Sequence, residues 1–413
     1  MGSLFDELEE DNKKAGLFSS NDNDVLYPMG FPILDQMLGY SQDINMPDGS
    51  VYTQYKMGLR YGSLNLFVGP SSSGKTAASI QAAQNIVEPF GEDSGVLLLD
   101  AEGSSNAQRV LDVTGIDAET FGKTWRIISR KGMTFDMALE QIKLIANKKA
   151  SDPKRYTYNS KVKDVFGQDI ICYKPSVVIV DSLMKLVSNA GDEEEIQGLT
   201  SAGRDTVQRN KWYRNIMSFC IEYNIIVIII NHLGNDIQLQ PGKGGAKQLT
   251  FIPTGKNIPG GEKTIYYPSS IIVWQPINSK DQIKTEEENG YNGVLVKAAV
   301  CKSRTGPGGI TATLEFVQES GFDIDLTLVH FAKERGLIMG RNPSCYFASN
   351  PDIKFDTRIF LKELDERPEL VQELYMACKP SLMGMVRKSA SINSEKMENK
   401  RRGRQFLRDM CSM

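Results

Sequence analysis

Residues 69–76 have the composition of a phosphate-binding loop. They match the pattern G-x-x-x-x-G-K-[ST] in full, follow the apolar run Leu64–Val68 and precede a helical stretch that begins at Ala77. Glycines let the backbone wrap so that its N–H groups point at phosphate oxygens, and the positive end of the helix dipole adds to the attraction. Lys75 would neutralise the β and γ phosphates of a nucleotide, and the Thr76 hydroxyl would be a ligand of Mg²⁺. The loop residues are Gly69, Pro70, Ser71, Ser72, Ser73, Gly74, Lys75 and Thr76.

Two carboxylates follow apolar runs that have the form of buried strands. Asp181 comes directly after Val177–Val180, and Glu102 comes shortly after Val96–Leu99. Ligands of open α/β sheets bind at the carboxyl ends of the strands, so both acids are expected near the phosphate loop. Asp181 would orient Mg²⁺, and Glu102 would polarise the attacking water. The alternatives are an ordinary helix cap for Asp181 and a solvated loop acid for Glu102.

Short β-rich runs alternate with longer helical patterns from Leu64 onward. This alternation predicts an α/β fold with a mainly parallel, twisted sheet flanked by helices. Residues 1–45 are interpreted as an N-terminal arm that docks on a neighbouring subunit, residues 46–338 as the core, and residues 339–413 as a small C-terminal domain with a basic tail. The expected strands lie at Leu64–Val68, Val96–Leu99, Val177–Val180, Ile225–Ile230, Ile271–Trp274, Val294–Cys301 and Thr311–Phe316.

The composition is that of an ordinary globular protein. The chain has 413 residues, of which 40% are hydrophobic and 24% charged, and its formal net charge of -3 offers no general attraction to nucleic acid. The longest apolar run, Ile225–Ile230, is far shorter than the roughly 20 residues of a membrane span, and the acidic N-terminus is no signal peptide. Six cysteines without a C-x-x-C pair favour reduced thiols over a zinc site. We therefore expect a cytoplasmic protein.

The order of these motifs resembles the RecA family of recombination ATPases, and most closely its phage UvsX-like branch. The phosphate loop is followed by Asp-Ala-Glu after the next strand, and then by Asp-Ser after an apolar strand. Ile225–Ile230 ends in Asn231-His232, similar to the family's polar sensor of the γ phosphate. The likeness spans Tyr27 to Ile338. It implies a RecA-like P-loop ATPase core that uses ATP and Mg²⁺.

The resemblance also gives roles to residues that the spacing alone does not explain. Lys302 and Arg304 resemble the family's paired basic residues, which reach a neighbouring subunit's ATP and complete its transition-state stabilisation. Solvated charges on a sheet edge are the alternative. His232 would sense the γ phosphate and relay its presence into the following loop, although a satisfied core histidine is the alternative. Arg109 could stack on adenine.

A long segment from Leu233 to Pro268 stands where the family has its second DNA-binding loop. Its lysines would contact phosphates without reading sequence, and Phe251 could wedge between bases; a disordered excursion is the alternative. Ser188–Gly203 stands where the family has its first loop, but the acids of Asp192–Glu195 would repel a phosphate backbone. The candidate DNA-binding residues are Lys243, Lys247, Phe251, Lys256, Lys263, Arg204 and Arg209.

Together these features predict a DNA-dependent ATPase that forms helical filaments on single-stranded DNA and promotes its pairing with homologous duplex DNA. The expected partners are single-stranded and double-stranded DNA, further copies of the chain, and single-strand-binding and mediator proteins, with no membrane. A phage-encoded protein would act in the host cytoplasm. The alternatives are a RecA-fold hexameric DNA helicase and a non-catalytic filament or mediator protein that ATP binding switches. No primase-binding domain is evident in the short N-terminal arm, which counts against the helicase.

Overall fold

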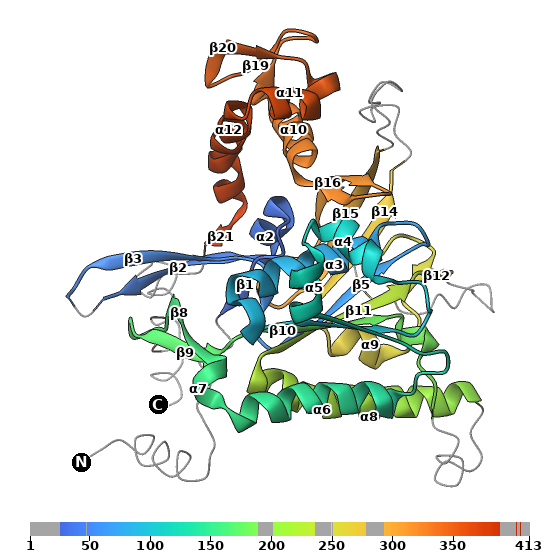
Figure 1. Ribbon diagram of the computed structural model, residues 1–413. Coiled ribbons are helices and arrows are strands. Elements are labelled where there is room, and N and C mark those ends of the chain that lie inside the picture. Colours follow the sequence, from blue (N-terminus) through green and yellow to red (C-terminus); the bar gives the residue numbers. More distant parts are fainter. Residues whose placement is uncertain are drawn as a thin grey trace.

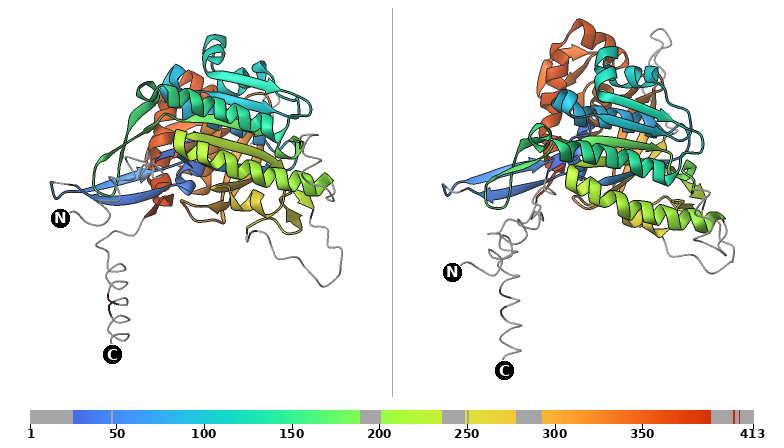
Figure 2. Two further views of the ribbon diagram at one scale, coloured as in Figure 1. Left: turned by 90° about the horizontal axis from the view of Figure 1, so that it is seen from below. Right: turned by 60° about the horizontal axis from the view of Figure 1, so that its bottom comes forward.

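The computed structural model has a central α/β core with a smaller C-terminal part above it and two hairpins that project from one side (Figure 1). It describes residues 25–46, 48–188, 201–235, 249, 251–277 and 293–388, together with residues 402 and 405. The projecting hairpins are visible again in both views of Figure 2. Within the described ranges, no helix has the length and apolar character that crossing a membrane requires.

The core is organised around a sheet that has nine strands in the described part of the chain, in the order β17-β16-β15-β14-β5-β11-β10-β6-β7. Neighbours from β14 to β7 are parallel, and β15, β16 and β17 extend the sheet with antiparallel pairs. The prediction of a mainly parallel sheet flanked by helices is therefore confirmed. The strands are β5 (Leu64–Gly69), β6 (Val96–Asp100), β7 (Trp125–Ser129), β10 (Ser176–Asp181), β11 (Ile225–His232), β14 (Ser270–Pro276), β15 (Gly293–Ser303), β16 (Ile310–Val317) and β17 (Gly321–Asp323).

Alternate residues of the central strands face two separate hydrophobic clusters. In β11, Ile228 packs with residues of α3 (Lys75–Val87), whereas Ile229 packs with residues of α6 (Phe135–Ser151) and α8 (Ser201–Tyr223). Both isoleucines are fully buried, which is why this strand is a continuous apolar run and does not alternate with polar residues. Figure 1 shows α6 and α8 side by side below the sheet. The other helices of the core are α4 (Ala107–Thr114), α5 (Ala118–Thr124), α7 (Pro153–Tyr156) and α9 (Glu262–Tyr266).

The described part of the predicted N-terminal arm packs into the core of its own chain. β1 (Leu26–Tyr27) pairs with β4 (Leu59–Arg60), and α2 (Pro32–Leu38) lies against β15 and β16. Phe31 and Leu34 are almost fully buried. The apolar side of the arm, which was expected at Leu4, Phe5 and Leu8, lies outside the described residues.

Two antiparallel hairpins extend the core. In the first, β2 pairs with β3, and in the second, β8 pairs with β9. The Lys163 amide donates a hydrogen bond of 3.1 Å to the Gln54 side chain and so joins the two hairpins. The domain boundary predicted between residues 45 and 46 falls at the end of β2, where the turn of the first hairpin begins. The strands are β2 (Tyr40–Asn45), β3 (Val51–Lys56), β8 (Thr157–Lys163) and β9 (Asp169–Tyr173).

The C-terminal part combines a small sheet, in the order β18-β19-β20, with three helices. α10 and α12 pack together, and Leu328 and Leu374 are fully buried. The last strand, β21, returns to pair with β2, which ties this part to the first hairpin. The boundary predicted between residues 338 and 339 falls inside β18. The elements are α10 (Ile324–Glu334), β18 (Ile338–Met339), β19 (Cys345–Phe347), β20 (Asn350–Phe355), α11 (Phe360–Glu366), α12 (Glu369–Met385) and β21 (Arg387–Lys388).

Candidate active site

The two glycines of the phosphate-binding loop are required by their surroundings. Gly74 has a φ of 79°, in the left-handed region, and a Cβ atom there would lie 2.7 Å from the Phe322 ring. A Cβ atom on Gly69 would collide with the Trp274 carbonyl oxygen. α3 begins directly after Gly74, so its amino-terminal N–H groups point into the loop. The loop therefore has the geometry of an anion cradle.

An aromatic cluster packs against the Gly74 end of this loop. The Phe322 ring makes edge and tilted contacts with Phe31, Trp274 and Phe316, at centroid distances between 4.9 and 5.6 Å. The Gln81 side chain of α3 both donates to the Phe322 carbonyl and accepts from its amide, each at 2.8 Å. The first turns of α3 are thereby held against β17, which restrains the loop that precedes them.

Lys75 lies folded back onto the loop and is buried. Its ammonium group donates to the Pro70 carbonyl at 2.5 Å and to the Ser73 hydroxyl at 3.3 Å. Burial lowers the pKa of Lys75 to about 8, and the negative charges of Asp181 and Glu102 oppose that shift. A buried cation with only weak compensation would gain strongly from a phosphate oxygen.

Thr76 and Asp181 bring two oxygen ligands together. The Thr76 hydroxyl donates to the Asp181 carboxylate at 2.8 Å. Burial raises the pKa of Asp181 to about 6; the Thr76 hydrogen bond lowers it, and the charge of Glu102 raises it further. Hydroxyl and carboxylate oxygens are ligands that Mg²⁺ prefers, so the residues present fit this ion. Among the described residues, no group of three or more His, Cys, Asp or Glu side chains is placed to hold a metal.

Glu102 lies in the loop after β6, beside the carboxyl end of β10. Its amide donates to the Asp181 carbonyl at 3.3 Å, and its carboxylate accepts from the Ser182 hydroxyl at 2.9 Å. The same carboxylate lies 3.4 Å from Nε2 of His232, which ends β11. The strand order β5-β11-β10-β6 thus brings Lys75 and Thr76 to the same sheet edge as these residues. Ser182 was not singled out in the sequence, although the Asp-Ser pair at a strand end was its signal.

The end of β11 is attached to the far end of the long loop. The Asn231 side chain donates to the Pro259 carbonyl at 2.9 Å and accepts from the His232 amide at 2.9 Å. The loop ends meet again where β12 (Gly234–Asn235) pairs with β13 (Lys256–Asn257). The end of β11 is therefore in direct hydrogen-bond contact with this loop.

Lys302 and Arg304 lie away from the phosphate loop of their own chain. In the sheet, Lys302 is opposite Ile271, which in turn is opposite Leu66 in the middle of β5. Arg304 lies level with the start of β5, because its amide donates to the Ser269 carbonyl and the Ser269 amide donates to the Leu64 carbonyl. The Lys302 ammonium donates to the Ile265 and Tyr266 carbonyls at the end of α9, and Arg304 also donates to the Tyr266 carbonyl. Burial lowers the pKa of Lys302 to about 8, with Arg304 contributing.

An exposed aromatic side chain that the sequence did not identify accompanies this basic pair. Tyr266 is 62% exposed, and the Lys263 ammonium lies 5.0 Å from the centre of its ring. Exposed aromatic rings beside basic groups are common at interfaces.

The guanidinium of Arg109 is engaged by backbone carbonyls. It donates to the Gln318 and Glu319 carbonyls at 2.7 and 2.8 Å, which anchors α4 on the turn between β16 and β17. Burial lowers the pKa of Arg109. The predicted stacking on adenine would have to use the face of this anchored guanidinium.

The candidate DNA-binding residues fall into three groups. Lys256 and Lys263 are exposed, and Phe251 is 48% exposed beside Gly309. Arg209 is only 4% exposed and donates to the Gly260 carbonyl at 3.2 Å, so it braces α8 against the end of the long loop. Its contact with a DNA phosphate stays a prediction. Outside the described residues lie Lys243, Lys247, the Arg204 side chain and the acids Asp192–Glu195.

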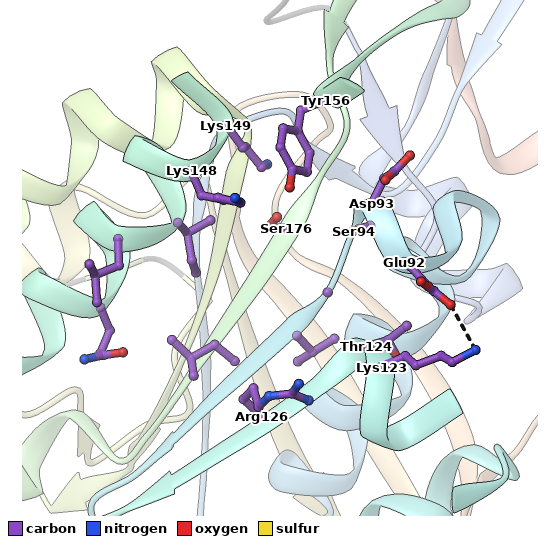
Figure 3. Close-up of a pocket in the computed structure, with 16 residues that line it drawn as sticks. Glu92, Asp93, Ser94, Lys123, Thr124, Arg126, Lys148, Lys149, Tyr156 and Ser176 are labelled. Atoms are coloured by element: carbon purple, nitrogen blue, oxygen red, sulfur yellow. Dashed lines mark ion pairs between the residues drawn. The ribbon is translucent and has the colours of Figure 1, made fainter. Parts of the chain in front are cut away.

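A cavity of about 560 Å³ opens at the amino-terminal ends of β6, β7 and β10, at the sheet edge opposite the phosphate loop (Figure 3). Exposed Leu144 and the basic side chains of Arg126 and Lys148 help to line it. Lys149 lies deeper, where its ammonium donates to the Lys174 carbonyl at 2.7 Å, and burial lowers its pKa to about 7. The acidic side chains of Glu92 and Asp93 line it as well, and Glu92 pairs with Lys123 at 3.0 Å, so the cavity has an apolar wall and a rim of mixed charge.

Comparison with known families agrees with the geometry. Residues 53–238 match the family model described as AAA domain, a span that contains the phosphate loop, Glu102, Asp181 and His232. The match concerns P-loop ATPases in general and carries nothing specific to UvsX-like recombinases. No curated protein matches the chain. Residues 53–238 are therefore similar to an AAA domain, and the chain carries a P-loop ATPase domain.

Proposed function

We propose that the chain is an ATP-dependent DNA recombinase that forms helical filaments on single-stranded DNA and promotes homologous pairing and strand exchange. The observation that carries the proposal is the separation of the phosphate loop from Lys302 and Arg304, which lie toward opposite edges of one sheet. A basic pair that cannot serve its own site can serve that of the next molecule, and head-to-tail contacts of this kind build filaments or rings.

The chemistry of the proposed site follows from the side chains that converge there. Lys75 binds the β and γ phosphates, and Thr76 and Asp181 hold Mg²⁺. Mg²⁺, when bound, neutralises phosphate charge. Glu102 orients the attacking water and accepts its proton. Charge from the neighbouring molecule's basic pair completes the site, so hydrolysis would depend on assembly.

DNA would bind at the long loop after β11. The hydrogen bond from the Asn231 side chain to the Pro259 carbonyl links the His232 end of the site to the loop, so ATP and DNA would affect one another's binding. Exposed Lys256 and Lys263 would contact phosphates, and Phe251 would stack on or between bases. Arg209 would act indirectly, through the backbone that it braces.

Self-assembly would also use the cavity at the opposite sheet edge. Its apolar wall and the basic side chains of Arg126 and Lys148 would face a segment that carries both apolar and acidic side chains, such as Leu4–Glu10 of a neighbouring molecule. A chain that lacks residues 1–24 should still bind ATP but should form filaments only at higher protein concentration. Single-strand-binding and mediator proteins are proposed as further partners.

Electron microscopy of the purified protein with single-stranded DNA and a slowly hydrolysed ATP analogue tests the proposal. Continuous helical filaments along the strand are the expected result. Closed rings would instead identify the second candidate, a hexameric helicase, which the same opposite-edge arrangement also permits. Assembly on DNA without any ATP turnover would identify a non-catalytic protein switched by ATP. Absence of DNA-dependent assembly would leave only the ATP site.

A further inference from the structure

Asp100 is a fully buried carboxylate that ends β6, close to the candidate general base Glu102. The proposed chemistry gives it no part in binding phosphate or Mg²⁺. It is opposite Asp181 in the parallel pairing of β6 with β10. Buried carboxylates are costly unless their oxygens accept hydrogen bonds, so the partners of Asp100 indicate its role.

Both oxygens of Asp100 are used to shape the loop that carries Glu102. One accepts from the Gly103 amide at 2.8 Å, and the other accepts from the Ser105 amide at 2.9 Å and from the Ser129 hydroxyl at 3.0 Å. Ser129 belongs to β7, so the loop is tied to the next strand as well. Gly103 has a φ of 71°, which permits the tight turn around the carboxylate.

We infer that Asp100 is a positioning residue for Glu102: it holds the loop so that the Glu102 carboxylate meets Ser182 and His232 beside the phosphate loop. The Glu102 amide donates to the Asp181 carbonyl, and its carboxylate accepts from the Ser182 hydroxyl at 2.9 Å. The chain must turn sharply between these contacts, and the bonds to Asp100 define that turn. The inference rests on the proposed function of Glu102 as the residue that activates water.

An amide at this position cannot replace the carboxylate. Asn would keep one acceptor oxygen, but its NH₂ group would replace the other oxygen. That oxygen now accepts from the Ser105 amide and the Ser129 hydroxyl, so donors would face a donor. The loop would shift to relieve this conflict, and a displacement of about 1 Å at a reacting group can cost about 100-fold in rate. The phosphate loop makes no hydrogen bond to Asp100 among the described residues. The charge of Asp100 raises the pKa of Asp181, so its removal would favour the charged form of that proposed Mg²⁺ ligand, and nucleotide binding should be preserved.

The test is the steady-state kinetics of Asp100→Asn in the full-length protein with saturating single-stranded DNA. We expect kcat to fall about 10- to 100-fold while the KM for ATP and the affinity for a non-hydrolysed analogue stay within about 2-fold. Asp164→Asn is the matched control. Asp164 is also a buried carboxylate that accepts from loop amides, those of Phe166 and Gln168, but it lies in the hairpin of β8 and β9. The Asp164→Asn substitution should leave kcat unchanged.

A double-mutant cycle with Glu102→Gln separates positioning from general damage. If Asp100 acts through Glu102, adding Asp100→Asn to Glu102→Gln should cause little further loss of kcat. Losses that multiply, or a matching loss of analogue binding, would overturn the inference. Full turnover by Glu102→Gln alone would instead reject the proposed role of Glu102. If Asp100→Asn does not fold, Ser129→Ala removes one of the hydrogen bonds and should lower kcat by about 2- to 5-fold with unchanged KM; no change in kcat would then overturn the inference.

Discussion

The Thr76 hydroxyl donates a hydrogen bond to the Asp181 carboxylate across 2.8 Å. This contact joins the first turn of α3 to the carboxyl end of β10, two elements that are far apart in the sequence. It brings together the two oxygens that are proposed to hold Mg²⁺, in a position where burial raises the pKa of Asp181 to about 6. Replacement of the Asp181 carboxylate should therefore lower ATPase activity but raise the stability of the nucleotide-free protein.

Asp181→Asn should abolish turnover and stabilise the nucleotide-free fold. Loss of the charged ligand should lower kcat by at least about 100-fold. The pKa of Asp181 is raised from 3.8 to about 6 in the folded protein. The contribution of this carboxyl to the free energy of unfolding therefore falls as the pH rises through that interval, and it stays low at higher pH. Asn does not titrate, so the variant should be more stable at pH 8 by about 1–3 kcal/mol, measured by thermal unfolding in EDTA. An active variant, or one that is less stable than wild type, would contradict this expectation.

Lys75 should take up a proton when ATP binds. Burial lowers its pKa to about 8, so about half of the nucleotide-free molecules lack this proton at pH 8. Phosphate oxygens favour the charged form and raise the pKa again. Isothermal titration calorimetry at pH 8 in two buffers of different ionisation enthalpy should report an uptake of about half a proton per site. The uptake should vanish at pH 6, where Lys75 is already charged, and in Lys75→Met; an uptake that persists in this variant would assign it to another group.

Lys302→Ala and Arg304→Ala should each remove turnover without preventing the isolated molecule from binding ATP. Charges of this kind contribute about 1000-fold or more to phosphoryl transfer when they act from a neighbouring subunit. Mixing either variant with Lys75→Ala should restore part of the ATPase activity. A Lys75→Ala molecule still supplies an intact basic pair to the live site of the other variant. Mixed filaments that remain inactive would show that the pair does not act in trans.

Glu315→Gln should remove a pH-dependent loss of stability. Glu315 is fully buried on β16, and within the described part of the chain neither of its carboxylate oxygens has a hydrogen-bond partner. Burial, assisted by the charge of Asp323, raises its pKa from 4.5 to about 7. The contribution of Glu315 to stability is therefore most favourable below pH 4.5, falls as the pH rises to about 7 and stays low above it.

Urea unfolding at pH 5 and pH 8 measures this effect. At pH 8 the Gln variant should be more stable than wild type by about 1–3 kcal/mol, and the difference should shrink at pH 5. Glu366→Gln, at the exposed end of α11, provides the control and should change stability equally at both pH values. If the difference in stability between Glu315→Gln and wild type were the same at pH 5 and pH 8, the Glu315 carboxyl would not be the cause of the pH dependence.

The central strands could be predicted because their burial on both faces leaves a direct trace in the sequence. The runs at Leu64–Val68 and Ile225–Ile230 became β5 and β11 with nearly the same bounds. The phosphate loop was equally readable, since its glycines are required by local geometry. The order of the strands was not, because it depends on packing between segments far apart in the chain.

The two hairpins were not predicted because only part of each is buried and several of the buried residues are polar, such as Gln54 and Lys56. Tyr52 and Ile171 are exposed, so an alternation that fits a strand gave no apolar signal distinct from a loop. The burial of Arg209 was missed for a related reason: an arginine on a helix with other charges reads as solvated, and only the packing of α8 against Gly260 encloses it. The loop around Asp100 likewise becomes meaningful only when its hydrogen bonds are known.

The opposite-edge placement of the phosphate loop and the basic pair has a numerical consequence for a head-to-tail polymer. Every junction completes one site, but the molecule at one end always keeps an incomplete site, so a polymer of n molecules has n − 1 working sites. Because the fraction of working sites is (n − 1)/n, short polymers would hydrolyse less ATP per molecule than long ones, and the rate per molecule would rise toward a limit as they grow. Filament length would thus act as the variable that sets the specific activity, without any separate regulator.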